Sequence, residues 1–222
     1  MRRPVRVVPA ILTDDSEALE KMVRNVETFT DFVQIDIMDN KFVPSGSVGY
    51  EQVAAVAPKL DWEAHIMVLN PEQYVEGFKK AGAGKIVFHL ESTTDPVMVI
   101  SRIRQAGLQA GLAVNPESTL EKFIPLVDKV DSLLFLTVHP GFYGAKFLPD
   151  VLDKVAEFRK RYPAMEIGVD GGIKEGNVVQ IAGMGVDVIC VGSAINLAPS
   201  PGDVYRRLLT LAQEGSRLNS KH

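Results

Sequence analysis

The chain has 222 residues, 46% of them hydrophobic, which is enough for one α/β barrel or for two domains of average size. Its 24 basic and 28 acidic residues give a formal net charge of −4 with no long run of either sign. This balance argues against nucleic acid or an anionic membrane as the main partner. The single cysteine, Cys190, excludes an intrachain disulfide and a thiolate metal cluster, and its apolar surroundings indicate a buried strand residue.

The two ends of the chain carry no sign of a membrane segment. The N-terminal stretch MRRPVRVVPAIL places two arginines before apolar residues, but prolines and a third arginine interrupt it. The apolar part is too short for a signal peptide or a membrane helix, so we expect a cytoplasmic protein. The polar C-terminal residues predict a flexible tail over 215–222.

Short β-branched runs recur along the chain and predict eight strands, which lie at 5–12, 32–38, 62–68, 85–91, 109–115, 132–138, 166–170 and 186–193. Amphipathic segments between them predict helices, among them 17–29, 71–82, 95–107, 118–130 and 148–162. Asn70-Pro71, Asp95-Pro96 and Asn115-Pro116 are typical of helix starts. Glycines in KKAGAG, RQAG and AGMG suit helix C-caps.

This alternation predicts a single α/β domain over residues 1–222, a closed (β/α)8 TIM barrel. An open doubly wound sheet fits less well, because no edge strand stands out. A dinucleotide-binding sheet would carry G-x-G-x-x-G after its first strand, where this chain has PAILTDD. In barrels the chemistry lies at the C-terminal ends of the strands, so unusual residues there matter most.

Acidic and imidazole side chains gather at these strand ends. Two-residue alternation directs Gln34 and Asp36 inward from one strand and His65 from the next, and Asp170 ends the seventh strand. We expect Asp36 and Asp170 to face one another across the mouth, with His65 beside Asp36. Two carboxylates in a buried pocket need a compensating cation or shared protons. A divalent metal such as zinc, iron, manganese or cobalt would provide it.

Neighbouring residues leave more than one interpretation open. Met38 and Met67 are most simply apolar filler that lines the site. His89 ends the fourth predicted strand and His139 lies in the loop after the sixth; each is either a supporting partner of the site or a residue with a loop or cap role. The glycine-containing stretch TVHPGFYGAKF at 137–147 predicts a lid over a ligand, although a surface turn has the same pattern.

Glycines after the last two strands predict a phosphate site. Gly171 and Gly172 follow the seventh strand, and Gly192 and Ser193 follow the eighth. Backbone N–H groups can approach an anion closely there, and these two loops are the usual phosphate site of the barrel. A phosphate-binding site beside two opposed acids suits epimerisation at a carbon next to a carbonyl. In that reaction one acid removes a proton from the carbon and the other returns a proton to its opposite face.

Successive motifs carry a resemblance to a known family. PAIL, QIDIMDNKFVP, AHIMV, FHLE, AVNPES, TVHPGFYGAKF, VDGG and VGSAI resemble, in order and over nearly the whole chain, the ribulose-phosphate 3-epimerase family. The resemblance implies interconversion of ribulose 5-phosphate and xylulose 5-phosphate, with Asp36 and Asp170 as acid/base pair and as metal ligands together with His65. It also implies a homo-oligomer and a phosphate site formed by Gly141, Phe142, Gly144, Gly171, Gly172, Gly192 and Ser193.

Several positions depart from the family pattern. Gln34 stands where the family has a fourth ligand, histidine; its amide oxygen binds borderline metals less well than imidazole, so we expect metal binding to be weakened or lost. Ala10 replaces a serine that contacts substrate, and Tyr143, Ala145 and Leu136 replace a glycine, a glutamine and a methionine.

Three hypotheses follow from these departures. The first is an epimerase for a five-carbon ketose phosphate, the second a sugar-phosphate-binding protein without turnover, and the third an epimerase for a six-carbon ketose phosphate. The related sugar-phosphate decarboxylases carry an Asp-x-Lys-x-x-Asp signature. The corresponding segment of this chain, DIMD, has no lysine, so a decarboxylase is disfavoured.

Overall fold

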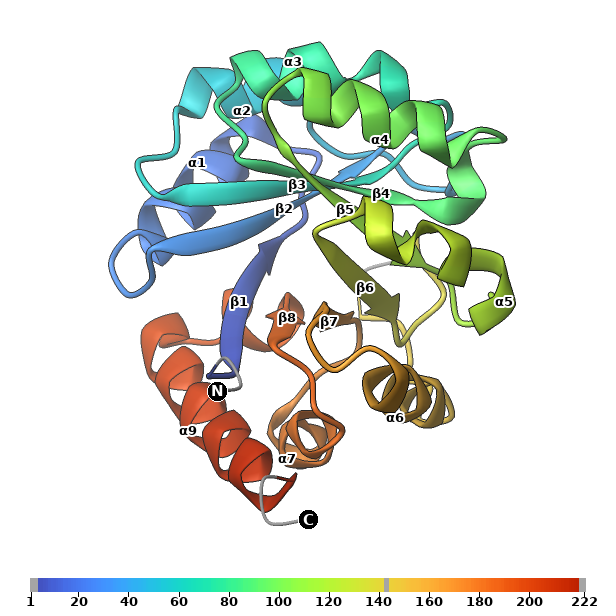
Figure 1. Cartoon of the computed structure of the whole chain (residues 1–222). Coiled ribbons are helices and arrows are strands. Elements are labelled where there is room, and N and C mark those ends of the chain that lie inside the picture. Colours follow the sequence, from blue (N-terminus) through green and yellow to red (C-terminus); the bar gives the residue numbers. More distant parts are fainter. Residues whose placement is uncertain (1–3, 142–143, 220–222) are drawn as a thin grey trace.

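The computed structural model describes residues 4–141 and 144–219. Eight parallel strands pair in chain order and close into a barrel, with the helices on its outside (Figure 1). This confirms the predicted (β/α)8 barrel. The strands are β1 (Arg6–Ile11), β2 (Phe32–Met38), β3 (Asp61–Met67), β4 (Lys85–His89), β5 (Gln109–Val114), β6 (Ser132–Leu136), β7 (Glu166–Asp170) and β8 (Val188–Val191).

Helices and short 3-10 turns connect the strands. They are α1 (Ser16–Val26), α2 (Tyr50–Val56), η1 (Pro71–Gln73), α3 (Val75–Lys80), η2 (Leu90–Ser92), α4 (Pro96–Gln105), α5 (Leu120–Phe123), η3 (Ile124–Lys129), α6 (Val151–Arg161), α7 (Glu175–Gly183), α8 (Ser193–Asn196) and α9 (Pro201–Asn219). The segments predicted as single helices at 71–82 and 118–130 are each divided in two. In the second, Pro125 lacks a backbone N–H and favours the 3-10 turn η3.

The helix start predicted at Asp95-Pro96 and the glycine C-cap predicted after that helix are present, but the helix start predicted at Asn115-Pro116 is not. Asp95 caps α4 by accepting a hydrogen bond from the Met98 N–H at 2.9 Å, and Gly107 takes the left-handed conformation after that helix, with φ +81°. Asn115-Pro116 starts no helix, because α5 begins only at Leu120. The Asn115 side chain lies instead against His89, with Oδ1 3.0 Å from Nδ1.

The C-terminal segment differs from the expected tail. Helix α9 continues to Asn219, and residues 220–222 lie outside the described part of the chain. Gly215 lets α9 approach α7 so closely that a Cβ there would collide with the Val179 carbonyl. Leu208 and Ala212 are fully buried on the same helix. This packing orders residues that polar composition alone marks as a tail. Nowhere in residues 4–141 and 144–219 is there a helix with the length and apolar character that crossing a bilayer requires.

Apolar side chains form two shells. The larger lies between the strands and the helices, and the smaller fills the middle of the barrel with Val8, Ala10, Val87, Ala113, Leu134, Leu136, Val188 and Cys190. Polar side chains lie above and below this inner shell. Strand pairing sets Asp36 beside His65 and Asp170 beside Leu136 and Cys190, so the predicted site residues share the C-terminal rim.

Candidate active site

A cavity opens at the C-terminal ends of the strands. The residues predicted for the site that line it are Asp36, Met38, His65, Met67, Leu136, Gly141, Gly144, Asp170, Gly171, Gly172, Gly192 and Ser193. Gln34 is fully buried one layer deeper in the barrel. Phe142 and Tyr143 lie outside the described residues.

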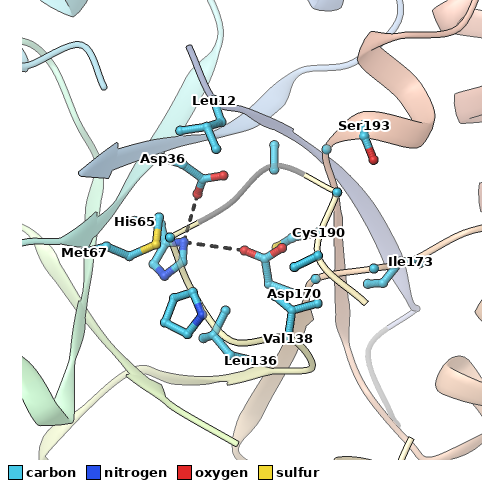
Figure 2. Close-up of a pocket in the computed structure, with 18 of the residues that line it drawn as sticks. Leu12, Asp36, His65, Met67, Leu136, Val138, Asp170, Ile173, Cys190 and Ser193 are labelled. Carbon is cyan, nitrogen blue, oxygen red and sulfur yellow. Dashed lines mark hydrogen bonds and ion pairs between the residues drawn. The ribbon is translucent and has the colours of Figure 1, made fainter. Parts of the chain in front are cut away.

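The two acids converge on His65 from opposite sides of the cavity. Asp36 Oδ1 lies 2.8 Å from His65 Nδ1, and Asp170 Oδ2 lies 3.5 Å from the same atom (Figure 2). The parallel register brings Asp36 and His65 together on neighbouring strands, whereas Asp170 reaches them from across the barrel. The expected arrangement of these three residues is therefore present in the structure.

Both carboxyl groups hold protons more strongly than an ordinary aspartate. Burial raises the pKa of Asp36 from 3.8 to about 7, and burial together with the charge of Asp36 raises the pKa of Asp170 to about 7. Near neutral pH the pair therefore holds a proton that either carboxyl can carry. One group can then act as an acid while the other acts as a base.

Gln34 lies between these acids. Its Nε2 donates hydrogen bonds of 2.8 Å to Asp36 Oδ1 and to Asp170 Oδ2, and it lies 3.4 Å from His65 Nδ1. Gln34 Oε1 is buried and accepts no hydrogen bond from any described residue. The opposite orientation of the amide would press this oxygen against two carboxylate oxygens, so the observed one is favoured.

The acids and His65 fit a divalent metal. One ligand atom from each of Asp36, His65 and Asp170 lies within 4.8 Å of the other two, and imidazole with carboxylates suits a transition metal. Gln34, predicted as a further ligand, presents N–H groups and no lone pair toward this position. It would have to turn its amide over to coordinate an ion.

A chain of hydrogen bonds behind His65 fixes its tautomer. His89 Nδ1 lies 3.0 Å from Asn115 Oδ1 and 3.6 Å from Glu91 Oε2, so this nitrogen carries the hydrogen. His89 Nε2 is then an acceptor for the Nε2–H of His65, at 2.9 Å. Burial lowers the pKa of both imidazoles, which favours their neutral forms. His65 therefore turns an unprotonated Nδ1 toward the acids, and His89 supports the site.

Close backbone packing shapes the predicted phosphate side of the cavity. Gly171 and Gly172 have φ values of +111° and +66°. A Cβ at Gly172 would come within 2.9 Å of the Phe147 backbone, so this turn requires glycine. The loops after β7 and β8 bring Gly172 and Ser193 to one cavity, and in Figure 2 Ser193 lies on the far side from His65.

The segment at 137–147 borders the mouth. Val138, Pro140, Gly141, Gly144 and Ala145 line the cavity. A Cβ at Gly141 would come within 2.8 Å of Pro44, which shows that the segment packs against the loop after β2. This position favours the lid interpretation over the surface turn, and closure over a ligand stays a prediction.

The remaining lining residues were not predicted as part of the site. They are Leu12, Ile173 and Cys190. Cys190 was expected only as a buried strand residue, yet it points into the barrel in register with Asp170. Counting two residues on from inward-facing Val188 would have found it. Leu12 ends the first predicted strand two residues after inward-facing Ala10, so the same count would have found it, whereas Ile173 lies in the turn between β7 and α7.

Comparison with known proteins gives the same assignment. The model of the ribulose-phosphate 3 epimerase family matches residues 6–196. The chain belongs to the ribulose-phosphate 3-epimerase family. It is 36% identical to the ribulose-phosphate 3-epimerase of Schizosaccharomyces pombe over 91% of this chain and 92% of the relative, and 35% identical to the cytoplasmic isoform of Oryza sativa over 97% of each.

Solved structures share the fold at low sequence identity. KGPDC from Streptococcus mutans superposes with a TM-score of 0.74 at 13% identity, over 94% of this chain and 97% of the other. The 3-hexulose-6-phosphate synthase of Salmonella typhimurium gives 0.71 at 18% identity, over 95% and 100%. At these identities the likeness concerns the barrel and not the chemistry.

Proposed function

We propose that this protein is an isomerase that epimerises D-ribulose 5-phosphate at C3 to give D-xylulose 5-phosphate. The observation that carries the proposal is the pair Asp36 and Asp170, two buried carboxyls with pKa values of about 7 on opposite sides of one cavity. Family membership and the names of the relatives support the choice of substrate.

The chain's own residues provide each proton transfer. The N–H groups of the loops after β7 and β8 hold the phosphate, which sets C3 between the two acids. One carboxylate removes the C3 proton from one face, and the electron pair moves into an enediolate with the C2 carbonyl. The other carboxyl, protonated at the start, delivers its proton to the opposite face of C3. The reverse reaction exchanges the two roles.

The apolar lining protects this exchange. Met38, Met67 and Leu136 surround the acids with side chains that cannot take up a proton, and each is buried. Water is thereby kept from the enediolate. We propose that Asp36, His65 and Asp170 would hold a zinc, iron, manganese or cobalt ion only if the Gln34 amide turned over, and the bound ion would then supply Lewis-acid chemistry at the enediolate oxygens. Gln34 would weaken that binding.

One further feature favours a larger substrate as a second candidate. Ala10, a methyl group in the cavity wall, leaves room where a hydroxyl would otherwise be expected. A second groove adjoins the cavity and shares Leu12, Met38 and Gly141 with it. A six-carbon ketose phosphate could extend into this groove.

The test is turnover of both sugars under the same conditions. We expect purified protein to convert ribulose 5-phosphate to xylulose 5-phosphate, followed by a coupled assay, with a higher kcat/KM than for six-carbon ketose phosphates. A higher value for a six-carbon sugar would favour the second candidate. Calorimetric binding of both without turnover of either would identify a binding protein.

Partners and place in the cell are proposals as well. We propose a homo-oligomer in the cytoplasm that acts on a small phosphorylated sugar and binds neither nucleic acid nor membrane. One relative is named a cytoplasmic isoform, and the chain's net charge of −4 is consistent with the absence of an anionic partner. Gel filtration of the purified protein tests the oligomer.

A further inference from the structure

We propose that the Gln34 carboxamide is a built-in bridge between Asp36 and Asp170, which holds the two acids in place without a divalent ion and excludes the ion from their midst. Gln34 is thereby a positioning residue for the acid/base pair. The catalytic part of this inference rests on the proposed function, whereas the structural part does not.

The geometry places one nitrogen where an ion would have to lie. Gln34 Nε2 is 2.8 Å from one oxygen of each acid and 3.4 Å from His65 Nδ1. An amide nitrogen carries two hydrogens, and here each is directed to a different carboxylate. The three groups that would surround an ion therefore already surround the amide nitrogen.

No other described side chain donates to these two carboxylate oxygens through a fixed hydrogen. The hydrogen-bond chain through His89 leaves His65 Nδ1 without a hydrogen, although this atom lies 2.8 Å from Asp36 Oδ1. Among the described residues, the Gln34 amide is therefore the fixed donor that links the two acids.

The bridge and an ion at this position exclude one another. To bind an ion, the amide must turn over and present Oε1, and both hydrogen bonds to the acids are then lost. Each orientation of the amide leaves some of its polar atoms without a partner. In the observed orientation this atom is the buried Oε1, which has no partner among the described residues. In the orientation that would coordinate an ion, the two Nε2 hydrogens would lose their carboxylate acceptors instead.

Two substitutions at this position replace the bridge with a ligand for the ion. Gln34→Glu keeps the shape of the side chain but replaces the NH2 donor by an oxygen, and Gln34→His introduces an imidazole. We expect zinc to bind either variant at least about tenfold more tightly than the wild type, as measured by calorimetry and by metal content after dialysis. We also expect a chelator to lower the Tm of both variants and to leave the Tm of the wild type unchanged.

The wild-type protein gives a direct signature that needs no variant to fold. In chelator, the two side-chain N–H signals of Gln34 in a 1H–15N spectrum should be shifted downfield and exchange slowly with solvent, because both hydrogens are bonded and buried. Zinc added at a concentration that saturates Gln34→His should leave these signals unchanged. Fast exchange of the two hydrogens, or purification of the wild type with one tightly held ion per chain, would overturn the proposal.

Isotope exchange separates this inference from the proposed function. If both hold, chelated wild type exchanges the C3 proton of ribulose 5-phosphate with deuterated water, and chelated Gln34→Glu does so at least about tenfold more slowly. If the bonded amide signals are present but no exchange occurs with or without metal, the bridge stands and the epimerase function fails. If exchange occurs only after metal is added to wild type, the function stands and the bridge fails.

Discussion

The two ends of the barrel interior both bury charge, but they balance it differently. At the N-terminal end, Lys85 Nζ lies 3.0 Å from Glu63 Oε2 and 3.3 Å from Glu166 Oε1. At the C-terminal end, Asp36 and Asp170 share one amide and one neutral imidazole. The first group contains its own cation among the described residues, and the second does not.

The pKa directions express this difference. Burial alone would lower the pKa of Lys85, but the charges of Glu63 and Glu166 raise it overall, so the ammonium is retained. Burial raises the pKa of Asp36 and of Asp170 to about 7, so their proton is exchangeable at neutral pH. A buried charge with a fixed partner stabilises the fold, whereas a buried acid without one is suited to proton transfer.

The largest expected effect comes from removing an acid at the mouth. Asp36→Asn and Asp170→Asn each abolish one of the two proton transfers, so we expect kcat for epimerisation to fall by at least about 10³-fold. Asp153→Asn, which makes the same change at an exposed carboxylate on the outer helix α6, is the matched control and should keep kcat. Near-normal turnover in either Asp variant would contradict the two-acid account.

The next effect concerns the ion-pair cluster of Lys85, Glu63 and Glu166 at the N-terminal end of the barrel. Lys85→Met leaves Glu63 buried without its ammonium partner, and we expect a loss of about 3–5 kcal/mol in the free energy of unfolding, measured in urea. The folded fraction should keep its kcat. The double variant with Glu63→Gln should recover part of the loss, and a single variant as stable as wild type would show that this ion pair is dispensable.

The acids at the mouth should make stability depend on pH. Their pKa values rise from 3.8 to about 7 on folding, so the folded state binds protons more tightly than the unfolded state does. The resulting stabilisation is full below about pH 4 and is lost as the pH rises through 7. In chelator, we expect wild type to lose up to about 4 kcal/mol over this range relative to Asp170→Asn. Parallel curves for the two proteins would refute the shifted pKa values.

A smaller effect is expected behind the site. His89→Leu removes the acceptor that fixes the tautomer of His65, and we expect kcat to fall by about 10–100-fold. His89→Gln keeps an acceptor oxygen and should recover part of the activity. If the leucine variant turns over as fast as wild type, the hydrogen-bond chain through His89 has no role in positioning His65.

Much of the fold could be predicted because its signals are local. Alternation within β2 and β3 identified the inward positions of Asp36 and His65, and the eightfold repeat predicted the closed barrel that brings Asp170 to them. The division of 118–130 and the helical structure of 215–219 were missed. The first depends on Pro125, and the second depends on the packing of Gly215 against α7, which is a contact between distant segments.

The site could be predicted as a set of residues but not as a network. Sequence period fixes which face of a strand Gln34 occupies, and it says nothing about which end of the amide points inward. That orientation depends on Asp170, 136 residues away in the chain. The pairing of His65 with His89 likewise depends on the rotamers of two buried rings. Such contacts follow from packing in three dimensions.

The most direct test of the central claim is proton exchange at C3 of ribulose 5-phosphate in deuterated water, followed by NMR with wild-type protein. If Asp36 and Asp170 bracket this carbon, deuterium enters C3 and appears in both ribulose 5-phosphate and xylulose 5-phosphate. Folded protein that leaves the C3 proton in place, with or without added zinc, manganese, iron or cobalt, would contradict the account.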